Sequence, residues 1–419
     1  MIDGGGLSRA LRAVHAAGEL TRSDLCAATG LNRSSVAAIV HELIERGVVE
    51  EGAGSSGGVG RPSLVVRAIP DSVAVIGWDV RADSSSAIVE GLGGRILHRW
   101  SKVHRRGSTD PYEVAARIVA GSSEIVEEMP DHLILVGIGC AIPGIVDPIG
   151  SVTISSAPAG SSTTGSSTSG SSTTGIVHRA PTLGWVDTPF GVIVSEAIRE
   201  RFGSDLPVLL GNDANLGAMA EWTRGAGRRS RVMVFVSGDV GIGGGVIIDG
   251  QPLTGATGFA GEIGHIRFDP QGAACRCGAR GCWETVIGLT SIVSSAGLDP
   301  LKAGIDDVLA GASTGDRGCQ AALVDAARAV GQGLAPVVNM VNPDTIVLAG
   351  HLEVLLEHYR HTILEELRHT LSRENTAIRV LGPELGGDSI VVGAAEFAFE
   401  YALERPQRWL DSSEFLRSE

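Results

Sequence analysis

The sequence predicts an α/β chain in two parts, a winged helix-turn-helix followed by a larger two-lobed body. Residues 1–67 show three short helical patterns, whereas strands and helices alternate after residue 70. A set of three strands, a helix and a further strand occurs early in the body, and a similar set follows it, which indicates two related lobes. A length of 419 residues is sufficient for two or three domains with a sizeable core.

Three helices are predicted in residues 1–67 from apolar spacing and capping residues. The first covers 7–17, the second begins after Thr21 with Asp24 in a capping-box position, and the third begins after Asn32. The short turn between the second and third helices is typical of a helix-turn-helix. A Gly/Ser-rich stretch between two short apolar strands then predicts a flexible wing.

Exposed polar residues of this segment favour contact with DNA. The third helix would present Arg33, Ser34 and Ser35 to the edges of a major groove, and Arg61 in the wing would enter a minor groove. Residues 1–67 hold seven arginines and seven acidic residues, so this segment is neutral in a chain of net charge −14. That charge argues against a general polyanion binder. A three-helix packing module without a DNA partner is the alternative.

The body is predicted from alternating and helical apolar patterns. We expect strands at 73–80, 87–92, 96–103, 133–141, 208–210, 232–237, 244–248 and 345–349, and helices at 111–128, 192–202, 214–224 and 321–340. The domains would be a first lobe at 68–190, a second at 191–380, and a C-terminal helix within 381–419 that returns to the first lobe. A Ser/Thr/Gly repeat predicts a flexible insertion at 155–178. A single open Rossmann sheet is the alternative fold, but its glycine-rich motif is missing.

A cysteine cluster within residues 261–284 predicts a metal site. Cys275, Cys277 and Cys282 form a C-x-C-x4-C pattern, and His265 precedes the first of them by ten residues. Three thiolates and one imidazole are the ligand set of a closed, structural, tetrahedral Zn²⁺ site. Three unrelated buried thiols are the alternative, but half of the chain's six cysteines fall within eight residues.

This stretch resembles the signature of the ROK family, which is named for repressors, open reading frames and sugar kinases. The family's E-x-G-H and C-x-C-G-x-x-G-C-x-E motifs stand complete at residues 262–265 and 275–284. The N-terminal segment is also similar to the DNA-binding heads of ROK repressors, which share its T-G-L and Gly-Arg-Pro motifs. The resemblance implies an actin-like, ribonuclease-H-like body of the sugar-kinase type, in which the substrate lies between two lobes.

The resemblance also implies a sugar site. In the family, the equivalents of Asn212, Asp213, Glu262, His265 and Glu284 line the sugar pocket, and the aspartate is the general base of the kinases. Asn212 and Asp213 lie between a predicted strand and a predicted helix, so helix capping alone would also explain that pair. His265 is expected to bind zinc through one ring nitrogen and to face the sugar with the other.

The nucleotide-binding motifs of ROK kinases are not matched. The family's first loop, D-x-G-G-T, has lost both glycines and the threonine in residues 79–84. The second loop has Asp239 in place of its first glycine, and a carboxylate there repels a triphosphate. The G-G that kinases favour near the adenine is replaced by Ala349-Gly350-His351. Because phosphoryl transfer depends on positioning and charge stabilisation, we expect no kinase activity.

These observations predict a sugar-responsive transcriptional regulator, specifically a repressor of carbohydrate-utilisation genes. Its partners would be operator DNA and a sugar or sugar-phosphate effector, and we expect a homodimer or homotetramer. A glucokinase-like sugar kinase with a DNA-binding head is the enzyme alternative, because Asp213 is intact. A sugar-binding scaffold whose head contacts protein is a third possibility. The sequence does not specify the sugar, the operator or the direction of the response.

The sequence also bears on the compartment of the protein. No apolar run reaches the length of a membrane span, and the N-terminus lacks the order of a signal peptide. Clustered cysteines are typical of a metal site rather than of a disulfide framework. We therefore expect a cytoplasmic protein that does not contact a membrane.

Overall fold

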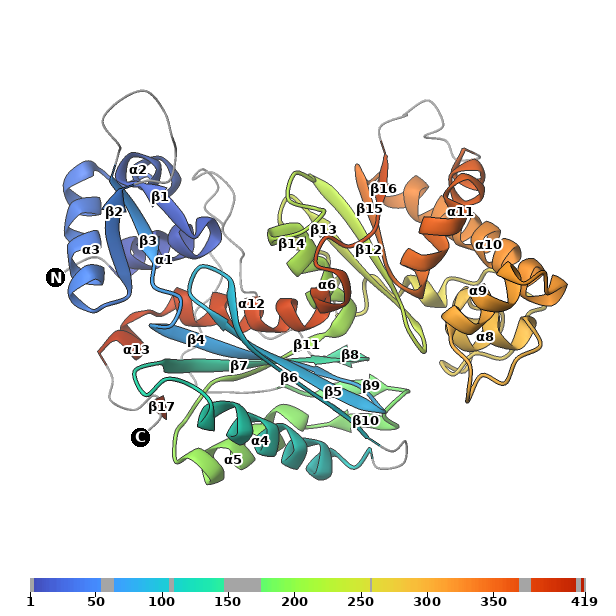
Figure 1. Cartoon of the computed structure of the whole chain (residues 1–419), viewed down its shortest axis with the longest axis horizontal. Helices are drawn as coiled ribbons and strands as arrows, with labels where there is room; N and C mark the ends of the chain where they lie inside the picture. The colour runs from blue at the N-terminus through green and yellow to red at the C-terminus, as the bar shows by residue number, and fades with distance from the viewer. Residues whose placement is uncertain are drawn as a thin grey trace. The chain divides into compact units, whose positions relative to one another are not determined.

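The computed structural model describes residues 4–53, 64–104, 109–146, 175–256, 258–368, 378–411 and 416–417. It divides into two compact units, one of Met1–Gly211 with Val391–Glu419 and the other of Asn212–Ile390 (Figure 1). The predicted winged helix-turn-helix and mixed α/β body are confirmed. Residues 155–174 of the predicted insertion lie outside the described residues, and Val177 and His178 belong to a strand.

The winged-helix domain in the first unit is held by helix caps and a small apolar core. Its elements are α1 Gly4–Ala17, β1 Glu19–Thr21, α2 Arg22–Thr29, α3 Arg33–Glu45, β2 Val49–Ala53 and β3 Leu64–Ala68. Strand β3 pairs with both β1 and β2. Thr21 and Asp24 form the predicted capping box of α2, and the Asn32 side chain caps α3. Leu11 and Leu25 are fully buried at the centre of this domain.

The remainder of the first unit is a sheet with helices on both faces (Figure 1). Its strands run in the order β11-β7-β4-β5-β6, with β17 Leu416–Arg417 beside β7. The bounds are β4 Val73–Val80, β5 Ser84–Gly91, β6 Arg95–Val103, α4 Pro111–Glu127, β7 Ile134–Ile142, α5 Phe190–Phe202, β11 Val208–Asn212, α12 Ser389–Glu404 and α13 Gln407–Leu410. A small sheet of β8 Ile145–Val146, β9 Val177–Ala180 and β10 Trp185–Thr188 lies outside this order.

Helices α4 and α5 share an apolar core with one face of this sheet, and α12 lies on the other face. Two glycines allow α12 to come very close. A Cβ at Gly77 would lie 2.4 Å from the Val391 carbonyl oxygen, and one at Gly139 would lie 1.9 Å from that of Ala394. The sheet surface beneath α12 is therefore smooth at these two positions.

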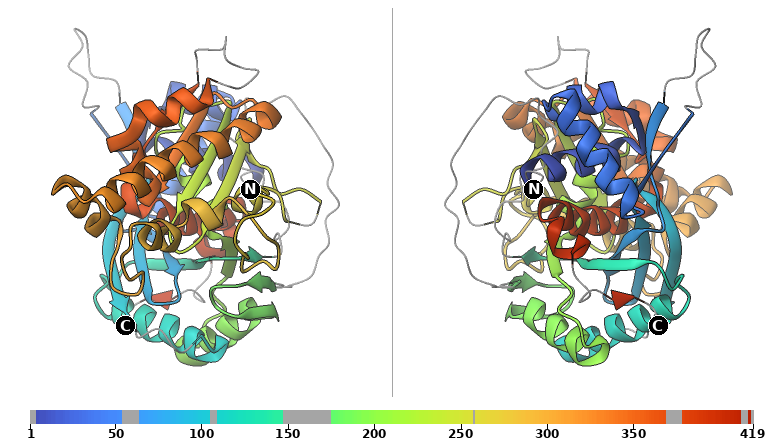
Figure 2. Two further views of the ribbon diagram at one scale, coloured as in Figure 1. Left: turned by 90° about the vertical axis from the view of Figure 1, so that its right-hand side faces the viewer. Right: turned by 90° about the vertical axis from the view of Figure 1, so that its left-hand side faces the viewer.

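The second unit has a five-stranded sheet in the order β14-β13-β12-β15-β16. Its strands are β12 Val232–Gly238, β13 Ile242–Ile248, β14 Gln251–Pro252, β15 Thr345–Gly350 and β16 Arg379–Leu381. Its helices are α6 Asp213–Thr223, η1 Ile263–His265, α7 Glu284–Ile287, α8 Leu289–Ser295, α9 Ile305–Ser313, α10 Arg317–Val341, α11 His351–Leu367 and η3 Gly386–Asp388. Helix α6 covers one face, and α10 and α11 form the main core with the other (Figure 2).

The long strands and helices lie where the apolar patterns predict them, within a few residues. Among the elements that the apolar patterns do not predict are β8, β9 and β10, and helices α8, α9 and α11. Helix α11 contains a non-helical residue, Tyr359, with φ −126° and ψ 25°, which interrupts its pattern. No helix within the described ranges is long and apolar enough to cross a membrane.

Candidate metal centre and ligand site

The four predicted metal ligands come together in the second unit. The ligand atoms of His265, Cys275, Cys277 and Cys282 all lie within 4.8 Å of one another. Cys275 Sγ is 3.6 Å from His265 Nδ1, and the Sγ atoms of Cys277 and Cys282 are 3.6 Å apart. Ligand atoms about 2.0 to 2.3 Å from a tetrahedral Zn²⁺ lie about 3.5 to 3.8 Å from one another. Both distances fit the edges of such a tetrahedron.

The loop that carries these ligands is shaped by its backbone and anchored by a tryptophan. The Phe268 N–H donates to the Gly281 carbonyl at 2.7 Å. Gly281 has φ 70°, and a Cβ there would lie 1.5 Å from the Asp269 carbonyl oxygen, so only glycine fits. The fully buried Trp283 donates its indole N–H to the Ala329 carbonyl at 2.8 Å, which ties the loop to α10.

The chemistry of the thiols also fits a cation. Burial, together with the neighbouring Cys277 and Cys282 thiols and the Glu284 carboxylate, raises the pKa of the Cys275 thiol to about 12. Three thiolates this close together would repel one another without a positive charge between them. A bound Zn²⁺ would supply that charge and hold the thiols in the deprotonated form.

Two carboxylates flank the cluster on different sides of the imidazole. His265 Nε2 lies 3.8 Å from Glu262 Oε2, whereas Nδ1 faces the Cys275 thiol. Glu284 accepts hydrogen bonds from the Cys275 thiol at 3.5 Å and from the Ile242 N–H at 3.1 Å. Burial raises the pKa of Glu262, an effect that His265 opposes and Glu284 strengthens. The ring of His265 therefore connects the cysteine cluster to a half-buried carboxylate.

Asn212 and Asp213 lie where β11 ends and α6 begins. The Asn212 side chain accepts from the Asn215 N–H at 2.9 Å, so it caps α6 as the capping alternative proposes. Asp213 Oδ1 accepts from the Ala214 N–H at 2.8 Å. Both residues are half-buried, and the first turn of a helix favours a carboxylate. Capping does not exclude ligand contact, because each side chain has further polar capacity.

The glycines of β13 bring the two groups of residues onto neighbouring positions. A Cβ at Gly243 would lie 2.8 Å from the Ala214 Cβ of α6, and one at Gly244 would lie 2.4 Å from the Gly261 carbonyl oxygen. Ile242, the first residue of β13, binds Glu284. Three parts of the candidate site therefore pack on the first three residues of β13. They are the start of α6, the loop that precedes Glu262, and the side chain of Glu284.

The segments compared above with the nucleotide-binding loops of ROK kinases make other interactions in this chain. In the first unit, the Arg81 Nε–H donates to the buried Asp79 carboxylate at 2.8 Å. In the second unit, Asp239 lies exposed in the turn between β12 and β13. The imidazole of His351 is 5% exposed, hydrogen-bonds the Ile287 carbonyl at 2.7 Å, and lies against Gly238. The His351 ring thus fills space beside the end of β12.

The predicted DNA-contacting residues begin α3. Arg33 and Ser34 are exposed and Ser35 is half-buried. The Ser34 hydroxyl donates a hydrogen bond to Asn32 Oδ1 at 2.7 Å, and Asn32 Oδ1 also accepts one from the Ser35 N–H at 2.9 Å. Two of the three polar residues therefore also serve the cap of α3. Arg61, in the predicted wing, lies outside the described residues.

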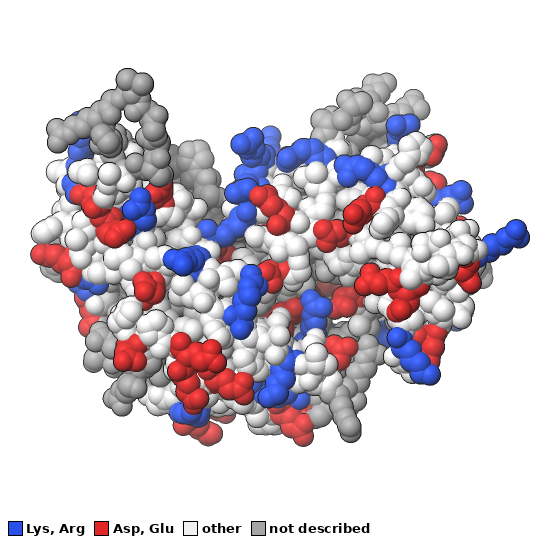
Figure 3. Space-filling model, viewed as in Figure 1, with Lys and Arg blue, Asp and Glu red and all other residues white. Residues whose placement is uncertain are grey.

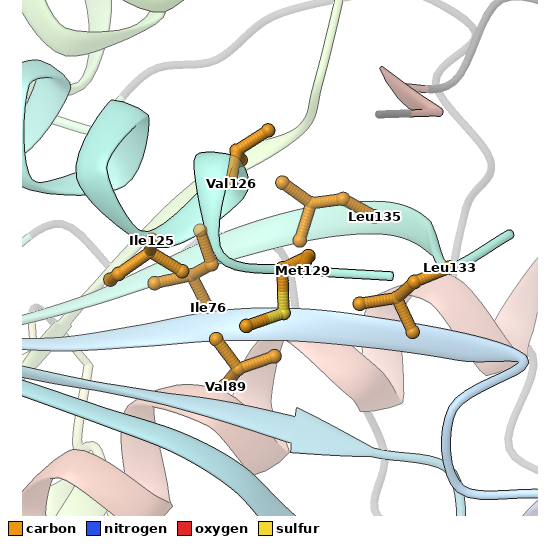
Figure 4. Close-up of a pocket in the computed structure, with 7 residues that line it drawn as sticks. All are labelled: Ile76, Val89, Ile125, Val126, Met129, Leu133 and Leu135. Atoms are coloured by element: carbon orange, nitrogen blue, oxygen red, sulfur yellow. The ribbon is translucent and has the colours of Figure 1, made fainter. Parts of the chain in front are cut away.

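Neither surface charge nor the apolar cavity of the first unit marks a further ligand site. On the face drawn in Figure 3, acidic and basic side chains are interspersed. The cavity under α4 measures about 10 Å³, room for about one water molecule. It is lined only by apolar side chains: Ile76, Val89, Ile125, Val126, Met129, Leu133 and Leu135 (Figure 4).

One buried charged residue of the second unit was not predicted from the sequence. Glu221 on α6 is fully buried and accepts four hydrogen bonds. The signal for Glu221 is a charged residue within an otherwise apolar run at the end of α6.

Comparison with known proteins identifies both parts of the chain. The model of the ROK family matches residues 75–400, and that of the MarR family matches residues 8–61. A xylose repressor of Bacillus spizizenii is 30% identical over 331 residues, which are 78% of this chain and 77% of that protein. The crystal structure of a ROK family transcriptional regulator, homologous to the E. coli MLC protein, has TM-score 0.75 and 22% identity, covering 98% of this chain and 99% of its own. A Streptomyces griseus ROK glucokinase in complex with glucose and AMPPNP has TM-score 0.62 and 25% identity, covering 78% of this chain and 99% of its own.

Replacing Cys277 or Cys282 with serine should release the metal. A hydroxyl is a poor substitute for a thiolate, and the remaining ligands leave the tetrahedron open. We expect metal content, measured by elemental analysis of the purified protein, to fall from about one zinc per chain to well below half. Cys319→Ser, at a buried cysteine of the same unit outside the cluster, is the matched control and should keep its metal. Full zinc content in both cluster variants would refute the ligand assignment.

Proposed function

Because the chain belongs to the ROK family, we propose that it is a sugar-responsive transcriptional regulator, a repressor of carbohydrate-utilisation genes. The observation that carries this proposal is the joining of a winged-helix domain to a ROK body in one chain. The xylose repressor of Bacillus spizizenii matches 78% of the chain, which supports the same reading of the whole molecule.

The winged-helix domain would bind operator DNA. Arg33 stands exposed at the start of α3, the end of a recognition helix that meets base edges. Ser34, Ser35 and the wing residue Arg61 would add contacts to the same site. The net charge of −14 supplies no general attraction to DNA, so affinity would depend on these local contacts. A homodimer or homotetramer would place recognition helices in major grooves about 10 bp apart, or a multiple of that.

The second unit would bind the sugar effector. Asn212 and Asp213 lie at the start of α6, which packs on β13. The segments that carry Glu262, His265 and Glu284 pack on the same strand, and the five residues together are rich in carboxylate oxygens and N–H groups. Such groups hold adjacent hydroxyls by donating and accepting in pairs. Zinc held by the cysteine cluster and His265 Nδ1 would be structural, since four protein ligands leave no open position. It would orient the imidazole so that Nε2 faces the ligand.

The chain would bind sugar without phosphorylating it. Phosphoryl transfer needs backbone and cationic groups around the triphosphate. Here Arg81 is engaged by Asp79, Asp239 adds negative charge, and His351 fills space beside Gly238. The enzyme alternative is a glucokinase-like kinase, favoured by the intact Asp213 and by similarity to the Streptomyces griseus glucokinase.

Operator binding by the purified protein should depend on sugar. Fluorescence anisotropy on the intergenic DNA beside its own gene, at fixed salt, is the measurement. D-xylose and D-glucose would be added first in a wider sugar panel. We expect one sugar to change the operator Kd at least about tenfold, within the usual range of allosteric coupling. Salt-sensitive binding that no sugar alters, or no binding above that of unrelated DNA, would contradict the proposal.

Arg33→Ala should weaken operator binding by roughly tenfold, the size of a lost base or phosphate contact at a recognition helix. Sugar affinity, measured by calorimetry, should be unchanged because Arg33 lies in the other unit. Arg328→Ala removes an equal charge from an exposed position on α10 and serves as the control. Equal loss of DNA affinity in both variants would mean that only general charge is involved.

Sugar-dependent ADP formation should be absent. The coupled assay would contain saturating ATP, Mg²⁺ and each sugar that binds, because the altered phosphate loops leave the triphosphate without its cradle. A ROK glucokinase in the same assay is the positive control. Turnover that is lost in Asp213→Asn would establish the kinase alternative.

A further inference from the structure

Helix α12 belongs to both units of the chain. Ser389 and Ile390 are counted with the second unit, and the rest of the helix, from Val391 to Glu404, with the first. The helix is continuous across this boundary. Its first residue contacts α6, which carries the candidate sugar site, and its later turns contact α1 of the winged-helix domain.

Glu221 holds the start of α12 to the end of α6. Its Oε1 atom accepts from the Ser389 hydroxyl at 2.7 Å and from the Leu385 N–H at 3.0 Å. Its Oε2 atom accepts from the N–H groups of Ala226 at 2.9 Å and Glu384 at 3.0 Å. Hydrogen bonds to a charged group are stronger than neutral ones, and this carboxylate is fully buried. The end of α6 and the turn before α12 should therefore move together.

The other end of α12 is joined to α1 by largely buried polar contacts. Arg12 Nη2 lies 2.7 Å from Glu400 Oε1, and the two side chains are 18% and 14% exposed. His15 Nε2 lies 3.3 Å from Glu396 Oε2. Removing water from such pairs offsets much of their attraction, so their main effect is to select one orientation. A changed position of α12 would break or re-form whole contacts.

His15 of α1 hydrogen-bonds both Glu396 of α12 and the backbone of Gly93. His15 Nδ1 accepts a hydrogen bond from the Gly93 N–H at 3.1 Å, so the ring proton is on Nε2 and is donated to Glu396. With Nε2 protonated, His15 is a poor metal ligand, although Glu90 is also close to it. A hollow of about 460 Å³ beside Gly93 is lined by residues of the winged-helix domain and of the sheet.

We propose that α6 and α12 form the regulatory connection of this chain, with Glu221 as the joint at the sugar end and Glu396 and Glu400 as the joint to the winged-helix domain. The inference rests on the proposed function. Sugar at Asp213, the first residue of α6, would displace that helix, and Glu221 would carry the displacement to Ser389. The smooth sheet surface at Gly77 and Gly139 suits small sliding of the helix above it.

Ser389→Ala tests the sugar end. Glu221 keeps its three backbone donors in this variant, so the fold should be retained. We expect this variant to bind sugar, and to bind the operator without sugar, as tightly as the wild type does. The ratio of the operator Kd values measured with and without D-xylose or D-glucose should be at least about threefold smaller than in the wild type. Ser230→Ala is the matched control, since that buried hydroxyl donates to Thr345 at 2.6 Å and does not touch α12.

Arg12→Met tests the other end, because it removes the charge and keeps the length of the side chain. It should lower the same ratio, and the reversed pair Arg12→Glu with Glu400→Arg should restore part of it. If both Ser389→Ala and Arg12→Met keep the wild-type ratio, the proposed connection through α12 is wrong, while the proposed function as a sugar-responsive regulator stands. If the wild-type protein binds sugar but shows no sugar-dependent change in operator affinity, the proposed function fails and the connection fails with it.

Discussion

The close packing of two segments on β13 is the constraint on which the candidate sugar site depends. Gly243 and Gly245 leave room for α6, and Gly244 leaves room for the loop that leads to Glu262. Any side chain at these positions would push one segment away from the strand and separate Asp213 from the cluster around His265. The glycines of the second phosphate motif therefore have a packing role that is independent of nucleotide. Their presence is no argument for kinase activity, whereas the acid at position 239 is an argument against it.

The parts of the structure that the sequence predicted are those set by local spacing. The cysteine cluster is local, since its ligands fall within residues 265–282 and a single loop brings them together. The caps at Thr21 and Asn32 are also local, and both lie where the residue types indicate. Periodicity located the long strands because a buried strand leaves a continuous apolar run. Short strands such as β8 carry too few residues for any pattern to be seen.

The contacts that the sequence did not predict join residues far apart in the chain. Glu221 and Ser389 are 168 positions apart, and Arg12 and Glu400 are farther apart still. Nothing near Glu221 distinguishes it from a solvent-exposed helix residue except the apolar residues around it. Asn212 and Asp213 were assigned to a ligand site only by family resemblance, because a helix cap explains their residue types equally well. Their packing beside β13 appears only in the folded chain.

Regulation by a small ligand requires that the ligand bind two arrangements of the protein unequally. Close-packed interfaces are not continuously deformable, so packing alone already favours discrete positions of α12. Buried hydrogen bonds strengthen this preference, because a buried donor or acceptor displaced from its partner carries the full penalty of lost solvation. Glu221, with four donors on one carboxylate, favours discrete positions over intermediate ones, and Glu400 lies in ion-pair distance of a largely buried guanidinium. In the proposed connection, these two joints would turn a small displacement of α6 into a choice between discrete positions of α12 beside α1.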